Sequence, residues 1–349
     1  MPNMISFESD YVEGADERIM RRLLETNMEQ TSGYGLDDYS ESAKSRIRTA
    51  FGCPEADVFF LVGGTQTNST VIDSLLDGYE GVIAADSGHI NVHEAGAVEF
   101  SGHKVLALSS VEGKLDPSAL DQYLNAFFED ASRIHMVFPG MVYISFPTEL
   151  GTLYSKSELE AIHGICRKHG MPLFIDGARL GYGLMSPAND IKATELADLC
   201  DVFYVGGTKV GALFGEAVVF PHHTAPAHFF TTVKRHGALL AKGRLLGIQF
   251  DTLFTDNLYF DISSHAIEMA QLMASIFQEK GYEFHIRSKT NQQFMIMDNR
   301  LIDALLKKVK FEVWGPVDDS RSVVRFVTSW ATKRENVLAL ETLLEASPR

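Results

Sequence analysis

The sequence predicts an α/β fold, with a large domain built on a mostly parallel seven-stranded sheet and a smaller α+β domain after it. Short runs of β-branched and aromatic residues alternate with helical patterns as far as Phe220. Several of these runs are almost continuously apolar, which suits a sheet covered by helices on both faces. Beyond about residue 250 the order of the elements changes. These observations together predict the fold class.

The first elements are expected to be two helices, over residues 16–31 and 42–51. In the first of them Ile19, Leu23 and Leu24 recur at helical spacing. Gly33 follows this segment and Gly52 follows the second, each at a position typical of a helix end.

The strands of the large sheet are expected at residues 58–62, 81–85, 104–108, 134–138, 172–176, 201–205 and 217–220. Helical spacing is found between them, notably over residues 66–76, 117–128 and 156–169. Alternation of strands and helices is typical of a parallel sheet with crossover helices.

The C-terminal part is expected to contain a long helix over residues 264–280, then a strand at 293–298 and a helix at 301–309. A strand at 322–328 and a helix at 333–344 complete it. We therefore expect a large domain over residues 1–250 and a small α+β domain over residues 251–349.

The charge balance disfavours several classes of partner. With 31 Lys and Arg against 46 Asp and Glu, the net charge is −15. An acidic protein has no general attraction for phosphate backbones or anionic lipid surfaces, so we expect neither nucleic acid nor a membrane as partner. An anionic ligand must instead be bound by local donors. A small-molecule ligand is the remaining expectation.

The cysteines and the N-terminal residues indicate the cytoplasm. Cys53, Cys166 and Cys200 are odd in number and widely spaced, which predicts neither disulfides nor a zinc knuckle. No basic segment followed by an apolar run opens the sequence, and no apolar stretch reaches the length of a membrane helix. We expect no metal site, and take the pair His222-His223 as a surface feature.

Polar residues follow several of the expected strands, at the edge where open α/β sheets bind ligands. The first group is Gly63-Gly64-Thr65, which leads directly into a helix. Backbone N–H groups at a helix N-terminus, together with a hydroxyl, can bind a phosphate. An ordinary capped turn is the alternative. The G-x-G-x-x-G pattern is absent here, which disfavours a nicotinamide-dependent dehydrogenase.

Asp176 ends a buried strand, and Arg179 follows three residues later. An aspartate at this position often caps a helix. An ionised carboxylate can also keep a pyridine nitrogen protonated and so make the ring an electron acceptor. Both interpretations of Asp176 stay open on sequence grounds.

Lys209 lies in a glycine-rich turn, Gly206-Gly207-Thr208-Lys209, after another apolar strand. Burial lowers the pKa of a lysine and favours the neutral amine, which forms a Schiff base with an aldehyde. A structural lysine paired with a carboxylate is the alternative.

His89, in Ser87-Gly88-His89, follows a fourth strand. Its ring could stack on a flat cofactor or transfer a proton, although many histidines are purely structural. A phosphate site, a ring-nitrogen partner, an amine and a stacking group at one sheet edge match the needs of pyridoxal 5′-phosphate.

The sequence also resembles the threonine aldolases of the aromatic amino acid β-eliminating lyase group, over most of its length. The most specific match is Phe-Ile-Asp-Gly-Ala-Arg-Leu at residues 174–180. Further matches are the Gly-Gly-Thr-Gln-Thr-Asn turn at 63–68, the segment 87–96 with Glu-Ala-Gly at its end, and Thr208-Lys209. The resemblance implies an aspartate-aminotransferase-like fold, fold type I of the enzymes that use pyridoxal 5′-phosphate.

The resemblance also implies roles for individual residues. Lys209 would carry the cofactor, His89 would stack on its ring, and Asp176 would face the ring nitrogen. The other implied cofactor contacts are Gly64, Thr65, Arg179 and, from a neighbouring subunit, Lys242. The implied substrate contacts are Ser9, Tyr34, Arg179 and Arg325.

One position departs from the family pattern. Glu149 stands where the family commonly has a histidine near the substrate hydroxyl, so the base could be Glu149, His89 or a water that they hold. The activity implied is retro-aldol cleavage of L-threonine or L-allo-threonine to glycine and an aldehyde, in a homodimer or homotetramer. β-Elimination or racemisation on the same scaffold is the alternative reaction, and binding of the cofactor without turnover is a third possibility.

Overall fold

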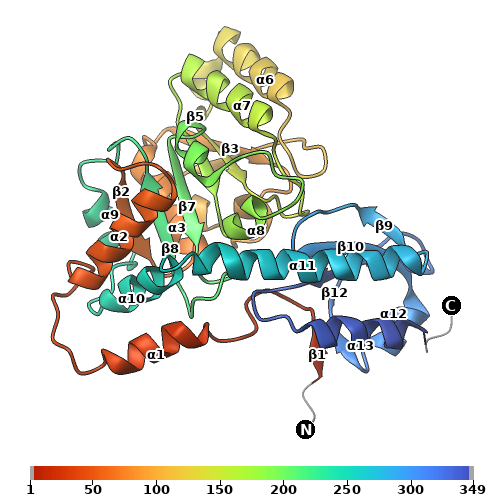
Figure 1. Cartoon of the computed structure of the whole chain (residues 1–349). Helices are drawn as coiled ribbons and strands as arrows, with labels where there is room; N and C mark the ends of the chain where they lie inside the picture. The colour runs from red at the N-terminus through yellow and green to blue at the C-terminus, as the bar shows by residue number, and fades with distance from the viewer. Residues whose placement is uncertain (1–3, 346–349) are drawn as a thin grey trace.

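The computed structural model describes residues 4–345 of the chain, which form a large sheet with helices around it and a smaller unit beside it (Figure 1). The large sheet has seven strands in the order β2-β8-β7-β6-β5-β3-β4. Their bounds are β2 Asp57–Leu61, β3 Glu80–Ala85, β4 Lys104–Leu108, β5 Phe138–Ser145, β6 Leu173–Asp176, β7 Val202–Gly206 and β8 Glu216–Phe220. Because β8 is antiparallel to both of its neighbours and the other pairs between β7 and β4 are parallel, the sheet is mixed and mostly parallel, as predicted.

The prediction of a strand over residues 134–138 was wrong. Arg133–His135 is a short 3-10 helix, and β5 begins at Phe138. The Pro139-Gly140 pair looks like a turn in the sequence, yet the register with β3 shifts at this point and accommodates the proline. Gly140 leaves room for the side chain of Glu80, because a Cβ at this position would lie 2.7 Å from it.

Several of the helices around this sheet begin at side-chain caps that the sequence contains. The helices that precede the sheet are α1 Glu17–Glu25 and α2 Asp38–Ala50, capped by Asp16 and Asp37. The others include α3 Gly64–Leu75, α6 Pro117–Glu129, α7 Lys156–Lys168, α9 Phe229–Arg235 and α10 Arg244–Leu253. The expected helix 16–31 thus ends early, after Glu25, where the Thr26 hydroxyl donates to the Arg22 carbonyl.

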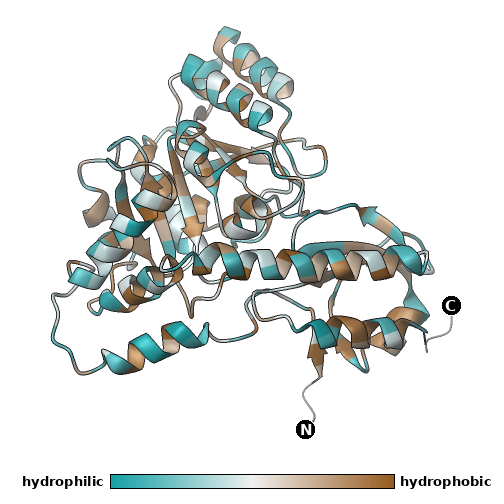
Figure 2. Cartoon of the chain, viewed as in Figure 1, coloured by the Kyte–Doolittle hydropathy of each residue, from teal (hydrophilic) through white to brown (hydrophobic). Residues whose placement is uncertain are grey.

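Apolar residues concentrate where these layers meet. Figure 2 shows the strands of the large sheet mostly in the hydrophobic colour, whereas the outer helices α6 and α7 alternate between polar and apolar residues. Ile83, Ile175 and Phe203 on the sheet are fully buried in one large core. No helix within residues 4–345 is both long and apolar enough to cross a bilayer.

The smaller unit contains an antiparallel sheet in the order β12-β13-β10-β9. These strands are β9 Glu283–Ile286, β10 Gln292–Asp298, β12 Glu312–Pro316 and β13 Arg321–Val327. The long helix α11 Leu258–Glu279 and the helices α12 Asn299–Leu305 and α13 Arg334–Glu345 accompany it. Strands β9 and β12 were not predicted, because both are short and largely exposed.

The N-terminal segment crosses to this smaller unit. Strand β1 (Ile5–Ser6) pairs in parallel with β11 (Val309–Lys310), so Val309 is not part of the helix expected over residues 301–309. Phe7 is buried among residues of α11 and β13. This crossing brings Ser9 and Asp10 next to the large domain. The division at residues 250 and 251 stays a prediction.

Candidate active site

A cavity of about 270 Å³ lies at the carboxyl ends of the parallel strands. The strand ends β5, β6 and β7 and the start of α3 contribute most of its wall. Seven residues selected from the sequence line it: Gly64, Thr65, His89, Glu149, Asp176, Arg179 and Lys209. The topology therefore brings together groups that are scattered over much of the chain.

The carboxylate of Asp176 accepts hydrogen bonds at both of its oxygens. Oδ1 accepts from the Tyr204 hydroxyl at 2.5 Å and from the Ala178 amide at 2.9 Å. Oδ2 accepts from the Tyr143 hydroxyl at 2.6 Å and from Asn68 Nδ2 at 2.9 Å. This set of donors fixes the orientation of the carboxylate and stabilises its charge.

The ionisation of Asp176 follows from these partners. Burial acts to raise the pKa of Asp176, but His89 and the hydrogen bonds from Tyr143 and Tyr204 outweigh burial, so the pKa is lowered. A buried anion thus lies at the wall of the cavity. The neighbouring Gly177 is required, because a Cβ there would collide with the Tyr204 carbonyl.

Glu94 orients His89. The distance from His89 Nδ1 to Glu94 Oε1 is 2.7 Å, and Asn68 donates to the same oxygen at 2.7 Å. When Glu94 is ionised it can only accept, so Nδ1 carries the hydrogen and Nε2 remains available. Asn68 and Glu94 were not selected from the sequence, although both lie inside segments that resemble the family.

Glu149 is the carboxyl group beside His89. Its Oε1 accepts from the His89 amide at 2.9 Å and from the Ser145 hydroxyl at 2.6 Å. Burial is the largest influence and raises the pKa of Glu149, and the nearby charge of Asp176 acts in the same direction. A carboxyl whose pKa is raised is a stronger base once it is ionised, which suits proton transfer.

Lys209 is buried in the turn after β7. Burial and the charge of Arg179 lower the pKa of Lys209, which favours its neutral amine. The Tyr182 hydroxyl donates to the Lys209 carbonyl at 2.6 Å and so fixes its backbone. Glu216, at the start of β8, also lines the cavity and was missed. In the sequence, Glu216 could have been found only as a single carboxylate at the start of an apolar strand.

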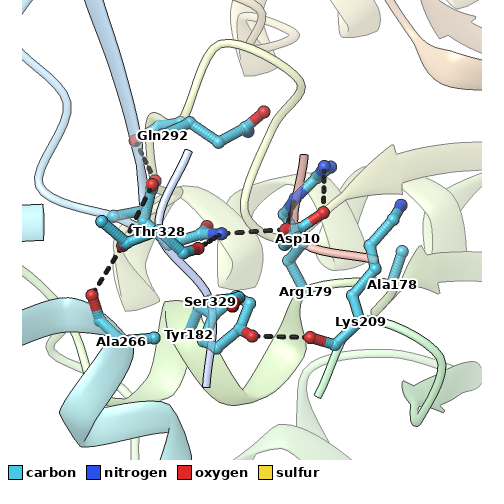
Figure 3. A network of polar contacts seen from close by, with 12 residues as sticks. Asp10, Ala178, Arg179, Tyr182, Lys209, Ala266, Gln292, Thr328 and Ser329 are labelled. Atoms are coloured by element: carbon cyan, nitrogen blue, oxygen red, sulfur yellow. Dashed lines mark hydrogen bonds and ion pairs between the residues drawn. The ribbon is translucent and has the colours of Figure 1, made fainter. Parts of the chain in front are cut away.

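Arg179 forms a buried ion pair with Asp10, which comes from the N-terminal segment. Arg179 Nε donates to Oδ2 at 2.6 Å and Nη2 donates to Oδ1 at 3.0 Å. Figure 3 shows this pair beside the side chain of Lys209. Asn291 adds a further donor to Asp10 at 2.8 Å. The sequence indicated Ser9 at this place, but not the role of the residue after it.

Ser9 and Arg325 lie near this pair and have unused hydrogen-bonding groups. Within residues 4–345, the buried Ser9 Oγ and Arg325 Nε have no hydrogen-bond partner. Arg325 is bound by Gln292 at 2.9 Å and by Glu312 at 2.5 Å. Burial and the charge of Arg179 lower the pKa of Arg325, so the two guanidinium groups influence each other. The unused N–H of the Arg325 guanidinium group and the free Ser9 hydroxyl suit a carboxylate ligand.

Tyr34 and Lys242 lie away from this cavity in the single chain. Tyr34 is exposed, and the Lys234 ammonium lies 4.7 Å from the centre of its ring. Lys242 lines a separate hollow with Thr26 and Arg244. The roles expected for both residues stay predictions.

The residues of the cavity fit pyridoxal 5′-phosphate. Helix α3 begins at Gly64, and its N-cap Gly63 offers no side chain to the first N–H groups, which leaves them for an anion. Thr65 adds a hydroxyl on the same wall. Lys209 can react with an aldehyde, and Asp176 can face a ring nitrogen. Within residues 4–345 there is no cluster of three or more side chains that could hold a metal ion.

Comparisons with known proteins agree with this geometry. The Beta-eliminating lyase family matches residues 6–300. A low specificity L-threonine aldolase from Pseudomonas sp. (strain NCIMB 10558) is 30% identical over 347 residues, which cover 97% of each protein. A structure of Leishmania major threonine aldolase is 39% identical, with a TM-score of 0.94 and 98% of each chain covered.

A more distant match supports the fold alone. A Thermus thermophilus aspartate aminotransferase has a TM-score of 0.70 at 16% identity, covering 98% of this chain and 91% of the other. The expected aspartate-aminotransferase-like fold, fold type I, is therefore confirmed.

Proposed function

Because the chain belongs to the beta-eliminating lyase family, we propose that it is an aldolase that uses pyridoxal 5′-phosphate. Its substrates are L-threonine, L-allo-threonine and related β-hydroxy-α-amino acids, and its products are glycine and an aldehyde. The observation that carries the proposal is the meeting of Lys209, Asp176 and Arg179 in one cavity of a chain with full-length relatives named as threonine aldolases.

One group of residues in the cavity binds the cofactor. Pyridoxal 5′-phosphate, when bound, supplies an aldehyde that reacts with amines and a ring that accepts electrons from the substrate Cα. Lys209 supplies the amine, and the N-terminus of α3 with Thr65 binds the phosphate. Asp176 remains ionised and holds a proton on the ring nitrogen. His89, whose orientation is fixed by Glu94, would stack on the ring.

The substrate side is formed by cationic groups and a carboxyl. Arg179 and Arg325 bind the substrate carboxylate, with Ser9 as a further donor. Glu149 or His89 removes the proton of the β-hydroxyl. As the oxygen forms the aldehyde carbonyl, the Cα–Cβ bond breaks and its electrons remain on Cα. A proton then returns to Cα, and glycine leaves.

The test is an assay of the purified chain with L-threonine and L-allo-threonine that follows acetaldehyde and glycine. We expect both products with added pyridoxal 5′-phosphate, and we expect Lys209→Ala to abolish them. Lys307→Ala, at an exposed lysine, is the matched control and keeps full activity. Aldehyde release by a folded Lys209→Ala protein would overturn the proposal.

We propose in addition a homodimer or homotetramer in the cytoplasm. Tyr34 and Lys242 lie outside the active-site cavity of their own chain. This supports an assembly in which they contribute to the active site of a neighbouring subunit. The free thiols of Cys53, Cys166 and Cys200 are buried, which is compatible with a reducing compartment. Sedimentation of the wild-type chain and of Lys242→Ala, with cofactor affinity measured on both, tests the assembly and the role of Lys242.

A further inference from the structure

Glu216 closes the turn that carries Lys209. It opens strand β8 opposite Gly206, the last residue of β7. Its Oε2 accepts from the Gly207 amide at 3.0 Å, and its Oε1 accepts from the Thr208 hydroxyl at 2.7 Å. Both donors belong to the residues immediately before Lys209. The carboxyl group is therefore joined to the backbone that positions the lysine.

The rest of the turn is tied down around the same point. The Gly215 amide donates to the Thr208 hydroxyl at 3.0 Å, and the Gly207 and Thr208 amides donate to the Gly215 carbonyl. Gly215 has φ +118°, which a residue with a Cβ rarely adopts. Glu216 is only 3% exposed, so its carboxyl must be satisfied by these donors.

The charges that face Lys209 come from several elements. Asp10 on the N-terminal segment, Asp176 at the end of β6 and Glu216 at the start of β8 favour its protonated form. Burial and Arg179 oppose them and lower the pKa of Lys209 on balance. Asp10 and Asp176 already have donors of their own that hold them ionised. Glu216 is different, because burial raises the pKa of Glu216 to about 8.

We propose that Glu216 is a positioning residue for Lys209, which fixes the turn and sets the pH at which the lysine nitrogen loses its proton. The charges of Lys209 and Glu216 act on each other across the cavity that both residues line: an ionised Glu216 favours the ammonium form of Lys209, and a neutral Glu216 leaves the amine free to be neutral. The inference deepens the proposed function, since it rests on the role of Lys209 in binding the cofactor.

The sign of the effect follows from the charges. An ionised Glu216 raises the pKa of Lys209, so replacing it by a neutral residue lowers the pH at which Lys209 becomes a free amine. A charge of opposite sign buried in the same cavity is worth about one pH unit. Glu216→Gln has the shape of the native side chain and keeps one acceptor oxygen, whereas Glu216→Asp retains the charge.

The experiment is competitive labelling of lysine amines in the cofactor-free, full-length chain at a series of pH values. Mass spectrometry gives the labelling midpoint of Lys209, with exposed Lys307 as internal reference in each sample. We expect Glu216→Gln to lower the Lys209 midpoint by about one pH unit. Glu216→Asp should stay near wild type, and Lys307 should not change. An unchanged Lys209 midpoint in folded Glu216→Gln overturns the inference.

The wild-type chain gives a second test that does not depend on how the variants fold. Two coupled groups titrate in two steps, so the labelling of Lys209 should follow a broad curve rather than a single ordinary transition. A single transition would overturn the coupling. A chain that takes up no pyridoxal 5′-phosphate, shown by the absence of a visible absorption band, would instead contradict the proposed function. The labelling result for Glu216→Gln does not depend on that outcome, because it is measured without the cofactor.

Discussion

Arg179 is held by Asp10 through two parallel contacts, from Nε at 2.6 Å and from Nη2 at 3.0 Å. Burial acts to raise the pKa of Asp10, but Arg179 and Lys209 outweigh it and lower the pKa, so Asp10 is an anion. The N-terminal segment thus aims the arginine that we assign to the substrate carboxylate. The contribution of Asp10 to the stability of the fold and its contribution to substrate binding can be measured separately.

Asp10→Asn is expected to impair both the stability of the fold and the binding of substrate. Breaking a buried ion pair leaves an uncompensated charge, which costs roughly 3–5 kcal/mol of unfolding free energy. With Arg179 no longer aimed, we expect the KM for L-threonine to rise about tenfold or more. Denaturant unfolding and steady-state kinetics measure the two effects. Asp121→Asn, which removes the surface partner of Lys168, is the control and should change neither. Native kinetics in Asp10→Asn would show that Asp10 does not aim Arg179.

Glu312→Gln is expected to improve substrate binding. Glu312 lies on β12 opposite Arg325 and binds its Nη2, so it competes with a substrate carboxylate for the charge of the guanidinium group. Because partly exposed pairs are weak, we expect KM to fall roughly two- to fivefold, with kcat unchanged. Glu283→Gln, at the partner of Arg321 on the same sheet, is the matched control. A higher KM in Glu312→Gln would mean that the pair holds Arg325 ready.

The sequence predicts the large sheet well because its strands are buried on both faces and therefore almost continuously apolar. The prediction fails for strands that are not continuously apolar or not buried on both faces. Strand β5 carries Pro139-Gly140, which looks like a turn and is absorbed by a register shift. Strands β9 and β12 are short and largely exposed, so their burial pattern is weak. The start of α2 was placed four residues late, although its cap Asp37 is visible in the sequence.

The site could be predicted where a residue ends a strand or lies in the short turn after it. His89, Asp176 and Lys209 are of this kind, and the cavity contains all of them. Partners supplied by distant segments could not be found, because no local pattern reports them. Asp10 lies 169 positions from Arg179, and Asn68 lies 108 positions from Asp176.

Tyr204→Phe is expected to make activity more sensitive to acid. The hydroxyl helps to lower the pKa of Asp176, so its removal raises that pKa. Since Asp176 acts as an anion, the loss of kcat on acidification should move to higher pH by about one unit. The pH profile of kcat measures the shift. Tyr259→Phe removes another buried hydroxyl, one that donates to the Gly206 carbonyl, and should leave the profile in place.

Glu149 is the residue on which the choice of base depends. Burial raises its pKa, and only the ionised carboxyl can accept the hydroxyl proton, so kcat/KM should rise with pH through a value above the ordinary range of a carboxyl. Glu149→Gln keeps the shape and the acceptor for the His89 amide but cannot accept a proton. We expect kcat to fall about 100-fold or more, because general bases contribute that much.

Three comparisons make the result for Glu149 specific. The visible absorption of the bound cofactor should be the same in Glu149→Gln as in wild type, because the change leaves Lys209 and Asp176 in place. Glu149→His supplies a neutral base at the same position and should recover part of the lost kcat, with its pH limb moved toward that of an imidazole. If Glu149→Gln keeps wild-type kcat while His89→Asn loses it, the proton goes to the imidazole, and Glu149 serves to hold His89 through its backbone amide.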